Sequence, residues 1–247
     1  MEQVTVGKTP VTGMRLYLEG KKCDRLAIHL QHLTAMPKIL QPLWEEHPFS
    51  GQVTWQDAED SNPRYFEPIQ WKSFSHVCTA PVENTETLIG DHAGSSVVIG
   101  TQLGIKSFGL KNVLFLRLLY SKIADAKIRR SEWDHMPSST QKTGVFSSFI
   151  STTFSAPAAL KPPPPPPLMP RIEMNSGVYP DGPPRPVVQS KLLKYVDTTE
   201  MTKGPQDMPG HWLVTGAKLY LDNKRISLRV KYSLLTIPSI DLYTSAL

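Results

Sequence analysis

The stretch VTGAKLYLDNKRISLRV (Val214–Val230) alternates apolar and polar residues on both sides of a short polar turn. Apolar residues fall three and five places after Gly216, at Leu219 and Leu221, and on alternate positions beyond the turn. Alternation with a period of two is typical of strands with one buried face. The stretch therefore predicts a β-hairpin.

Two other stretches repeat this pattern, VTGMRLYLEGKKCDRLAIHL (Val11–Leu30) and IGTQLGIKSFGLKNVLFLRL (Ile99–Leu118). The copies differ in length in their turns, which we expect at Glu19–Arg25, Lys106–Val113 and Asp222–Arg225. Alternating segments occur in any β protein, but the shared Gly, with Thr before it in two copies, favours a repeat. One hairpin cannot bury its own apolar face, so three copies predict packing around a shared core. The predicted fold class is mainly β, a threefold repeat of β-hairpins, with a β-prism as one compatible architecture.

Further strand candidates lie between the hairpins. Trp71–Thr79 precedes the second hairpin and Lys191–Thr199 precedes the third, with Val77 aligned to Val196. Val145–Phe154, rich in β-branched and aromatic residues, is a third candidate. The repeating unit is thus interpreted as one strand plus one hairpin. The strand ahead of the first hairpin is missing, which leads us to expect that the full protein extends upstream.

A run of six prolines interrupts the chain, at Pro162, Pro163, Pro164, Pro165, Pro166 and Pro167. Proline has no N–H to donate to a strand, so the run predicts polyproline II or loop. Residues 155–187 are interpreted as an irregular, Pro-rich connector and not as an element of the fold. Such a run is either a stiff spacer or a docking segment for aromatic grooves of partner proteins.

Composition excludes several classes of protein. The 247 residues include 23 prolines, about twice average usage, and carry a modest formal charge of +5. Two cysteines, Cys23 and Cys78, make no disulfide framework, which fits a reducing, cytosolic compartment. We see no signal peptide and no apolar stretch of about 20 residues that could span a bilayer. The sequence therefore predicts a soluble chain, or one that rests on a membrane surface.

No catalytic or metal-binding motif is apparent in the sequence. His76 and Cys78 share a strand face, but no third residue orients the histidine as a base for the thiol. His29 and His32 point to opposite faces of their predicted strand, so they cannot share a metal ion. There is no Gly-rich phosphate loop and no zinc-spaced Cys/His set. We predict no enzyme activity, no catalytic residues, no metal and no cofactor.

The best candidates for binding residues are cations of the third hairpin. They are Lys218, Lys224, Arg225, Arg229 and Lys231. Arg229 and Lys231 share a strand face opposite two apolar residues, so we expect both to face solvent. Each such cation near an anionic leaflet contributes about 1 kcal/mol. An exposed aromatic such as Trp55 could instead stack on a sugar.

Six long segments, in this order, resemble one plant family: Pro10–Lys22, Leu26–Leu33, Trp71–Pro81, Asn112–Leu118, Val196–Asp207 and Ile226–Leu235. Together they are similar to the C-terminal half of plant MACPF (membrane-attack-complex/perforin) domain proteins. These are the proteins named for constitutively activated cell death and necrotic spotted lesions. The family's pore-forming core, with its aromatic-Gly-Thr-His signature and helical clusters, precedes these segments and is not in this sequence.

The resemblance implies an organisation and a role. Residues 1–12 would be the tail of the MACPF core, 13–154 the first two repeats, 155–187 the connector, 188–236 the third repeat and 237–247 a tail. Perforin-like proteins elsewhere carry C-terminal β-rich targeting modules, some of them threefold β-prisms. For the full-length family, the resemblance implies negative control of salicylic-acid-linked programmed cell death in plant immunity.

We therefore predict a non-enzymatic regulatory or targeting module. It is expected to be cytoplasmic and peripheral at the plasma membrane, where it binds an anionic membrane surface or a signalling protein. Neither nucleic-acid binding nor a transmembrane span is expected. The alternatives are a protein-interaction scaffold read through the polyproline run, and a lectin-like glycan binder.

Overall fold

The structure is a computed structural model of the chain. It describes residues 3–5, 9–20, 23–33, 53–58, 62–84, 94–123, 126–134, 176–179, 192–203, 206–207 and 210–236. Most of these residues lie in β-strands, and the helices among them are the short 3-10 turns Pro63–Tyr65 and Leu193–Tyr195. The prediction of a mainly β protein is confirmed.

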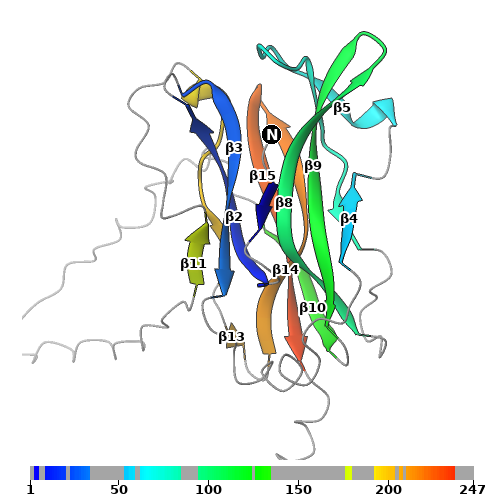
Figure 1. Ribbon diagram of the computed structural model, residues 1–247, viewed down its shortest axis with the longest axis vertical. Helices are drawn as coiled ribbons and strands as arrows, with labels where there is room; N and C mark the ends of the chain where they lie inside the picture. Colours follow the sequence, from blue (N-terminus) through cyan, green and yellow to red (C-terminus); the bar gives the residue numbers. More distant parts are fainter. Residues whose placement is uncertain are drawn as a thin grey trace, which may run out of the picture.

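Three long antiparallel hairpins form the frame of the molecule (Figure 1). They are β2 with β3 (Val11–Glu19 and Arg25–Leu33), β8 with β9 (Ser95–Phe108 and Lys111–Ile123), and β14 with β15 (Gly210–Asp222 and Arg225–Thr236). Each hairpin belongs to a different sheet, and all three turns lie at the same end of the molecule. All three hairpins occur where the alternating sequence predicts them.

Shorter strands complete each sheet. The first sheet has the order β1-β8-β9-β6-β5, with β4 also on β9; β1 is Gln3–Thr5, β4 is Thr54–Asp57, β5 is Phe66–Pro68 and β6 is His76–Cys78. The second has the order β10-β15-β14-β13, with β7 also on β14; β7 is Val82–Glu83, β10 is Lys127–Asp134 and β13 is Gln206–Asp207. The third has the order β11-β3-β2-β12; β11 is Ser176–Tyr179 and β12 is Met201–Thr202.

The shared glycine lies at the same structural place in all three hairpins. A register irregularity, as in a β-bulge, comes just before Gly13, Gly100 and Gly216. Opposite each glycine lies a short strand, β12 on β2, β1 on β8 and β7 on β14. A Cβ on any of these glycines would come within 3.0 Å of a backbone carbonyl oxygen of that strand. The glycine that recurs in the sequence therefore permits a close approach of two backbones.

The short strands are exchanged between hairpins. Strand β1 precedes the first hairpin but pairs with the second, β7 precedes the second but pairs with the third, and β12 precedes the third but pairs with the first. The registers match as well, with Thr202 opposite Gly13, Thr5 opposite Gly100 and Glu83 opposite Gly216. These correspondences are compatible with a threefold repeat, and both the repeat and the β-prism stay predictions.

The inner faces of the hairpins meet in one large hydrophobic core. Its members come from all three hairpins, for example the fully buried Leu16, Leu118 and Val230. Tyr120 lies among them, and its hydroxyl oxygen is 3.2 Å and 3.3 Å from the carbonyl oxygens of Val82 and Thr215. That hydroxyl thus links the second hairpin to the bulge of the third. The shared core predicted from the sequence is present.

The strand predictions ahead of the hairpins were too long. Within Trp71–Thr79 only β6 is strand, and within Lys191–Thr199 a 3-10 turn is followed by a single bridge at Val196. The alignment of the two segments nevertheless holds in space, because Val77 pairs in parallel with Leu114 and Val196 pairs in parallel with Ile226. Each segment contributes one apolar residue that pairs with the start of a long hairpin strand. A few residues suffice for this contact, so the segment itself need not be a long strand.

Two further expectations were wrong. The turn expected at Lys106–Val113 is only Gly109 and Leu110, because backbone pairing continues through polar, exposed residues after the apolar alternation has ended. The connector 155–187 contains β11, which pairs with the edge of β3 over residues that carry no proline. The polyproline run and the strand candidate Val145–Phe154 lie outside the described residues.

We predict that Gly13→Ala lowers the free energy of unfolding by about 1–3 kcal/mol, the range for overpacking. Its Cβ would come 2.8 Å from the carbonyl oxygen of Met201, which is backbone and cannot rotate away. Gly104→Ala, in the open middle of β8, is the control, since no atom lies within 4 Å of its Cβ position. Urea unfolding measures both variants, and equal losses of stability would contradict the close-approach argument.

Candidate contact surface on the three hairpins

The predicted cations of the third hairpin divide into two groups. Lys224 and Arg225 lie at the turn and are exposed. Lys218, Arg229 and Lys231 lie farther along the strands and are half-buried. Arg229 and Lys231 do lie on the face opposite buried apolar residues, but they are less open to solvent than the alternation predicts.

The three cations along the strands contact other residues of the fold. The Lys218 ammonium lies 5.1 Å from the ring centre of Trp133, and the Arg229 guanidinium lies 3.7 Å from that of Tyr220. Lys231 forms an ion pair with Glu83 of β7. Because of these contacts, Arg229 and Lys231 have less freedom to meet an external anion than the residues of the turn.

The ion pair of Lys231 depends on the strand exchange. Gly216 lies directly between Lys231 on β15 and Glu83 on β7 in the register of the sheet. Since glycine has no side chain, the carboxylate of Glu83 can cross over it to the ammonium. This pair could not be predicted from the sequence, because the partners are 148 residues apart.

The turn of the third hairpin has an unusual backbone. Asn223 and Lys224 have φ angles of 49° and 64°, both in the left-handed region. A two-residue hairpin turn of this kind favours Asn at its first position and Gly at its second. Lysine in the second position is strained. Arg225 follows, and its guanidinium is 3.5 Å from the carboxylate of Asp197.

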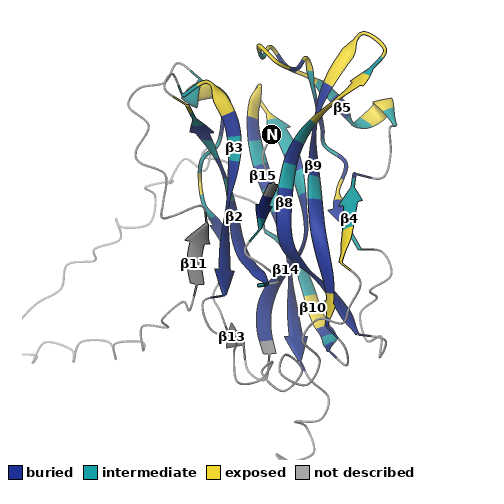
Figure 2. Cartoon of the chain, in the orientation of Figure 1, coloured by how far each residue is buried: buried dark blue, intermediate teal, exposed yellow. Residues whose placement is uncertain are grey.

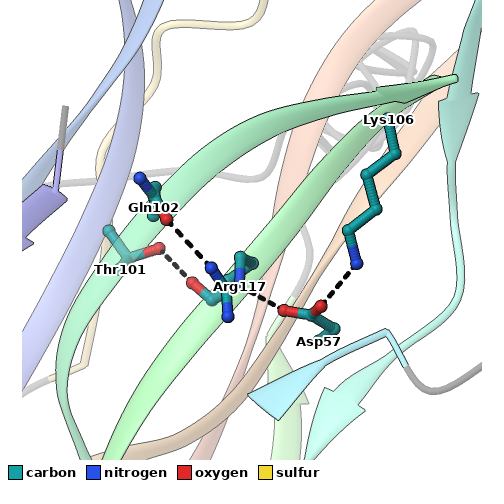
Figure 3. Close-up of polar contacts among 5 residues, drawn as sticks. All are labelled: Asp57, Thr101, Gln102, Lys106 and Arg117. Carbon is teal, nitrogen blue, oxygen red and sulfur yellow. Dashed lines mark hydrogen bonds and ion pairs between the residues drawn. The ribbon is translucent and has the colours of Figure 1, made fainter. Parts of the chain in front are cut away.

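The second hairpin brings two further cations to the same end, Lys106 and Lys111, both exposed. Figure 3 shows how the first is held: the Lys106 ammonium lies 2.5 Å from one oxygen of Asp57, and Arg117 binds the other. Arg117 also donates to the side chain of Gln102 at 3.3 Å. Asp57 thus ties two cations of the second hairpin to β4.

Asp57 keeps its charge because of these partners. Partial burial by itself would raise the pKa of Asp57, but hydrogen bonds and positive charge from Lys106 and Arg117 outweigh it, so the pKa lies below its usual value. The sequence analysis predicts binding cations at this end of the molecule only in the third hairpin. The pattern shared by the three hairpins is the signal that could have located the cations of the second hairpin. Hairpins in equivalent positions have their turns at the same end.

The thiol and histidine candidates, Cys78 and His76, both lie on β6. Cys78 is buried, and burial raises the pKa of its thiol, which opposes formation of the thiolate. The Nδ1 atom of His76 lies 3.0 Å from the hydroxyl oxygen of Ser75. Within the described ranges, no group of three or more His, Cys, Asp or Glu residues could hold a metal ion.

No helix in the described part of the chain is long and apolar enough to cross a membrane. The described residues define a β protein of exchanged hairpins, and Figure 2 shows that the ends of the hairpins are exposed. Exposed lysines and arginines lie at these turns together with the exposed carboxylates of Asp24 and Asp222. No family model matches the chain, and no solved structure matches it.

The relatives of the chain are plant proteins. It is 50% identical to the MACPF domain-containing protein CAD1 of Arabidopsis thaliana over 237 residues, which cover 95% of this chain and 37% of that protein. It is 50% identical to MACPF domain-containing protein At4g24290 of the same plant, covering 94% and 36%, and 44% identical to MACPF domain-containing protein NSL1, covering 97% and 37%.

The chain is thus homologous to a C-terminal part of plant MACPF domain-containing proteins. It spans little more than a third of the length of these relatives. The resemblance carried by the six sequence segments is confirmed.

We predict that Lys224→Gly raises the free energy of unfolding by about 1 kcal/mol, because glycine adopts a positive φ without steric cost. Asn223→Gly in the same turn is the control, since asparagine already tolerates this region and little is gained. Thermal and urea unfolding measure both variants. A loss of stability in Lys224→Gly would show that the lysine side chain supports the turn.

We also predict that Asp57→Asn lowers the free energy of unfolding at pH 7 by about 1 kcal/mol, in the range of exposed ion-pair networks. The depressed pKa means that this stability is present above pH 4 or so and is lost as pH falls through the folded-state pKa. The difference from the parent protein should therefore shrink in acid. Glu67→Gln on the nearby β5 is the control. A difference independent of pH would contradict the ion-pair account.

Proposed function

We propose that the chain is a non-enzymatic targeting module of a plant MACPF-family regulator, and that its cationic end binds anionic membrane surfaces. In this proposal the module acts in the cytoplasm at the plasma membrane, and the protein restrains salicylic-acid-linked programmed cell death in plant immunity. The observation that carries the membrane proposal is the gathering of exposed cations from separate hairpins at one end (Figure 1).

The charge at this end comes from side chains that water reaches. Lys111 and Lys224 are exposed, and so are Lys106 and Arg225, which each also contact a carboxylate. The three turns lie at the same end of the molecule, so this end can face a flat anionic surface. Each lysine or arginine near such a surface contributes about 1 kcal/mol, and salt weakens the attraction.

A lectin-like role has less support. The polar pocket beside Lys231, lined by Asn84, Ser131 and Ser233 among others, has a volume of about 60 Å³. That volume holds a few water molecules and is well below the size of a typical ligand pocket. Trp55 is half-buried, and the Arg117 guanidinium lies 5.3 Å from its ring centre, so little of the ring is open for stacking.

A protein-interaction scaffold remains the second candidate. The observation that favours it is the run Pro162–Pro167, which suits the aromatic grooves that bind polyproline II. Replacing the six prolines with Ser and Gly should abolish capture of a partner without unfolding the protein if this candidate is correct.

The membrane proposal is tested by flotation with liposomes that contain phosphatidylserine, at low and high salt. We predict that Lys111→Glu combined with Lys224→Glu weakens binding about thirty-fold at low salt, since two contributions of about 1 kcal/mol are lost. Neutral liposomes should not bind the parent protein.

The matched control is Lys122→Glu combined with Arg129→Glu. Both residues are exposed, and the change in net charge is the same, but they lie at the end of β9 and the start of β10, away from the turns. Equal losses for the two double variants would mean that net charge, and not the end of the molecule, governs binding. Absence of flotation by the folded parent protein would overturn the proposal and favour the scaffold.

A further inference from the structure

The turn of the second hairpin carries the most exposed apolar side chain of the described residues. The relative exposure of Leu110 is 105%, whereas nearly all other large apolar side chains there are at least partly covered. Gly109, with φ of 57°, makes the turn and places Leu110 at its tip. Scattered apolar residues on a surface need no explanation, so the argument depends on where this one lies.

The second hairpin reaches farther than the other two. Eight residues of β8 follow Gly100, whereas six residues of β2 follow Gly13 and six of β14 follow Gly216. Two extra residues lengthen a strand by about 7 Å. Figure 2 shows this tip as an exposed projection at the end where the turns gather.

Aromatic packing and an ion pair stabilise the part of the second hairpin just before its turn. Phe66, Phe108 and Phe115 form an aromatic cluster with ring centres 5.1 Å to 5.9 Å apart. The Lys106 ammonium lies 5.3 Å from the ring centre of Phe115 and is also bound by Asp57. A hairpin braced in this way presents Leu110 in one position, so binding through it would cost little ordering entropy.

Lysines lie on both sides of the leucine in the sequence. Lys111 follows it directly and Lys106 lies four residues before it, and both are exposed. The loop that contains Lys72 lies beside the hairpin, since the amide of Ser75 donates to the carbonyl of Asn112 at 2.8 Å. An apolar tip with lysines around it is suited to an anionic lipid surface, where the leucine meets acyl chains and the ammonium groups meet phosphates.

A protein partner is less well matched by this tip. Leu110 and Ile105, the exposed large apolar residues described on this hairpin, offer too little area for a stable protein interface. A membrane, in contrast, accepts one side chain at the tip while its flat surface meets the other turns.

We propose that Leu110 inserts into the interface of anionic membranes and that Lys111 binds a headgroup phosphate beside it. This inference rests on the proposed function and assigns its apolar anchor. Burial of one leucine strengthens membrane binding by about ten- to a hundred-fold.

The first test is Leu110→Ser, measured by flotation with phosphatidylserine liposomes. We expect binding to weaken at least ten-fold, and the loss should persist at high salt because the leucine carries no charge. Val53→Ser is the control: Val53 is 42% exposed, but it precedes β4, whose first residue pairs with Tyr120 far from the turn. That variant should bind like the parent protein.

The second test reports insertion directly. Leu110→Cys, in a Cys23→Ser background that leaves only the buried Cys78, is labelled with an environment-sensitive fluorophore. On anionic liposomes its emission should shift to the blue and be quenched by lipids with spin labels on their acyl chains. The same label at Val53→Cys should show neither effect.

The outcomes separate the two proposals. If the parent protein floats but Leu110→Ser binds equally well and the label is not quenched, insertion is wrong and surface attraction by charge stands. If the folded parent protein does not float at all, both proposals are overturned. Flotation together with acyl-chain quenching at position 110 establishes the anchor.

Discussion

The close contact between each bulge glycine and a strand borrowed from another hairpin is the constraint on which the structure depends. Carbonyl oxygens of Met201, Val4 and Val82 lie 2.8 Å to 3.0 Å from the position that a Cβ on Gly13, Gly100 and Gly216 would take. Because each short strand is followed in the chain by one hairpin and pairs with another, the hairpins cannot separate independently. Their inner faces share one core, and their turns are fixed at one end.

The close backbone contact at Gly216 also affects which cations of the third hairpin are available to bind an external anion. Glu83 reaches Lys231 only because Gly216, between them, has no side chain, so a charge of the third hairpin is balanced within the fold. The turns are farther from the exchanged strands, and Lys224 even occupies a backbone conformation that favours glycine. A strained residue kept at an exposed turn is a reason to look for function there.

The sequence predicts the three hairpins well and the connections between them poorly. Alternation over six or more residues, with a glycine at one end, identifies the long strands, because burial of one face imposes that period. Strands β1, β7 and β12 have two or three residues, too few to show any period, and their partners are distant in the chain. For the surface, Lys224 and Arg225 could be recognised, whereas Leu110 could not: it lies within the expected turn Lys106–Val113, but scattered apolar residues on a surface are common and carry no signal.

At this end of the molecule, the extra strand length of the second hairpin is similar to the distance over which surface charge acts. After its bulge glycine, β8 has two more strand residues than β14, which is about 7 Å of additional strand. The Debye length at physiological salt is about 8 Å. A molecule that approaches an anionic surface end-on therefore places Leu110 at the interface while Lys224 is still within range of the surface charge. If the second hairpin were shorter, Leu110 would lie level with Lys224. If it were much longer, Lys224 would lie so far from the membrane that salt would screen its attraction to the anionic surface.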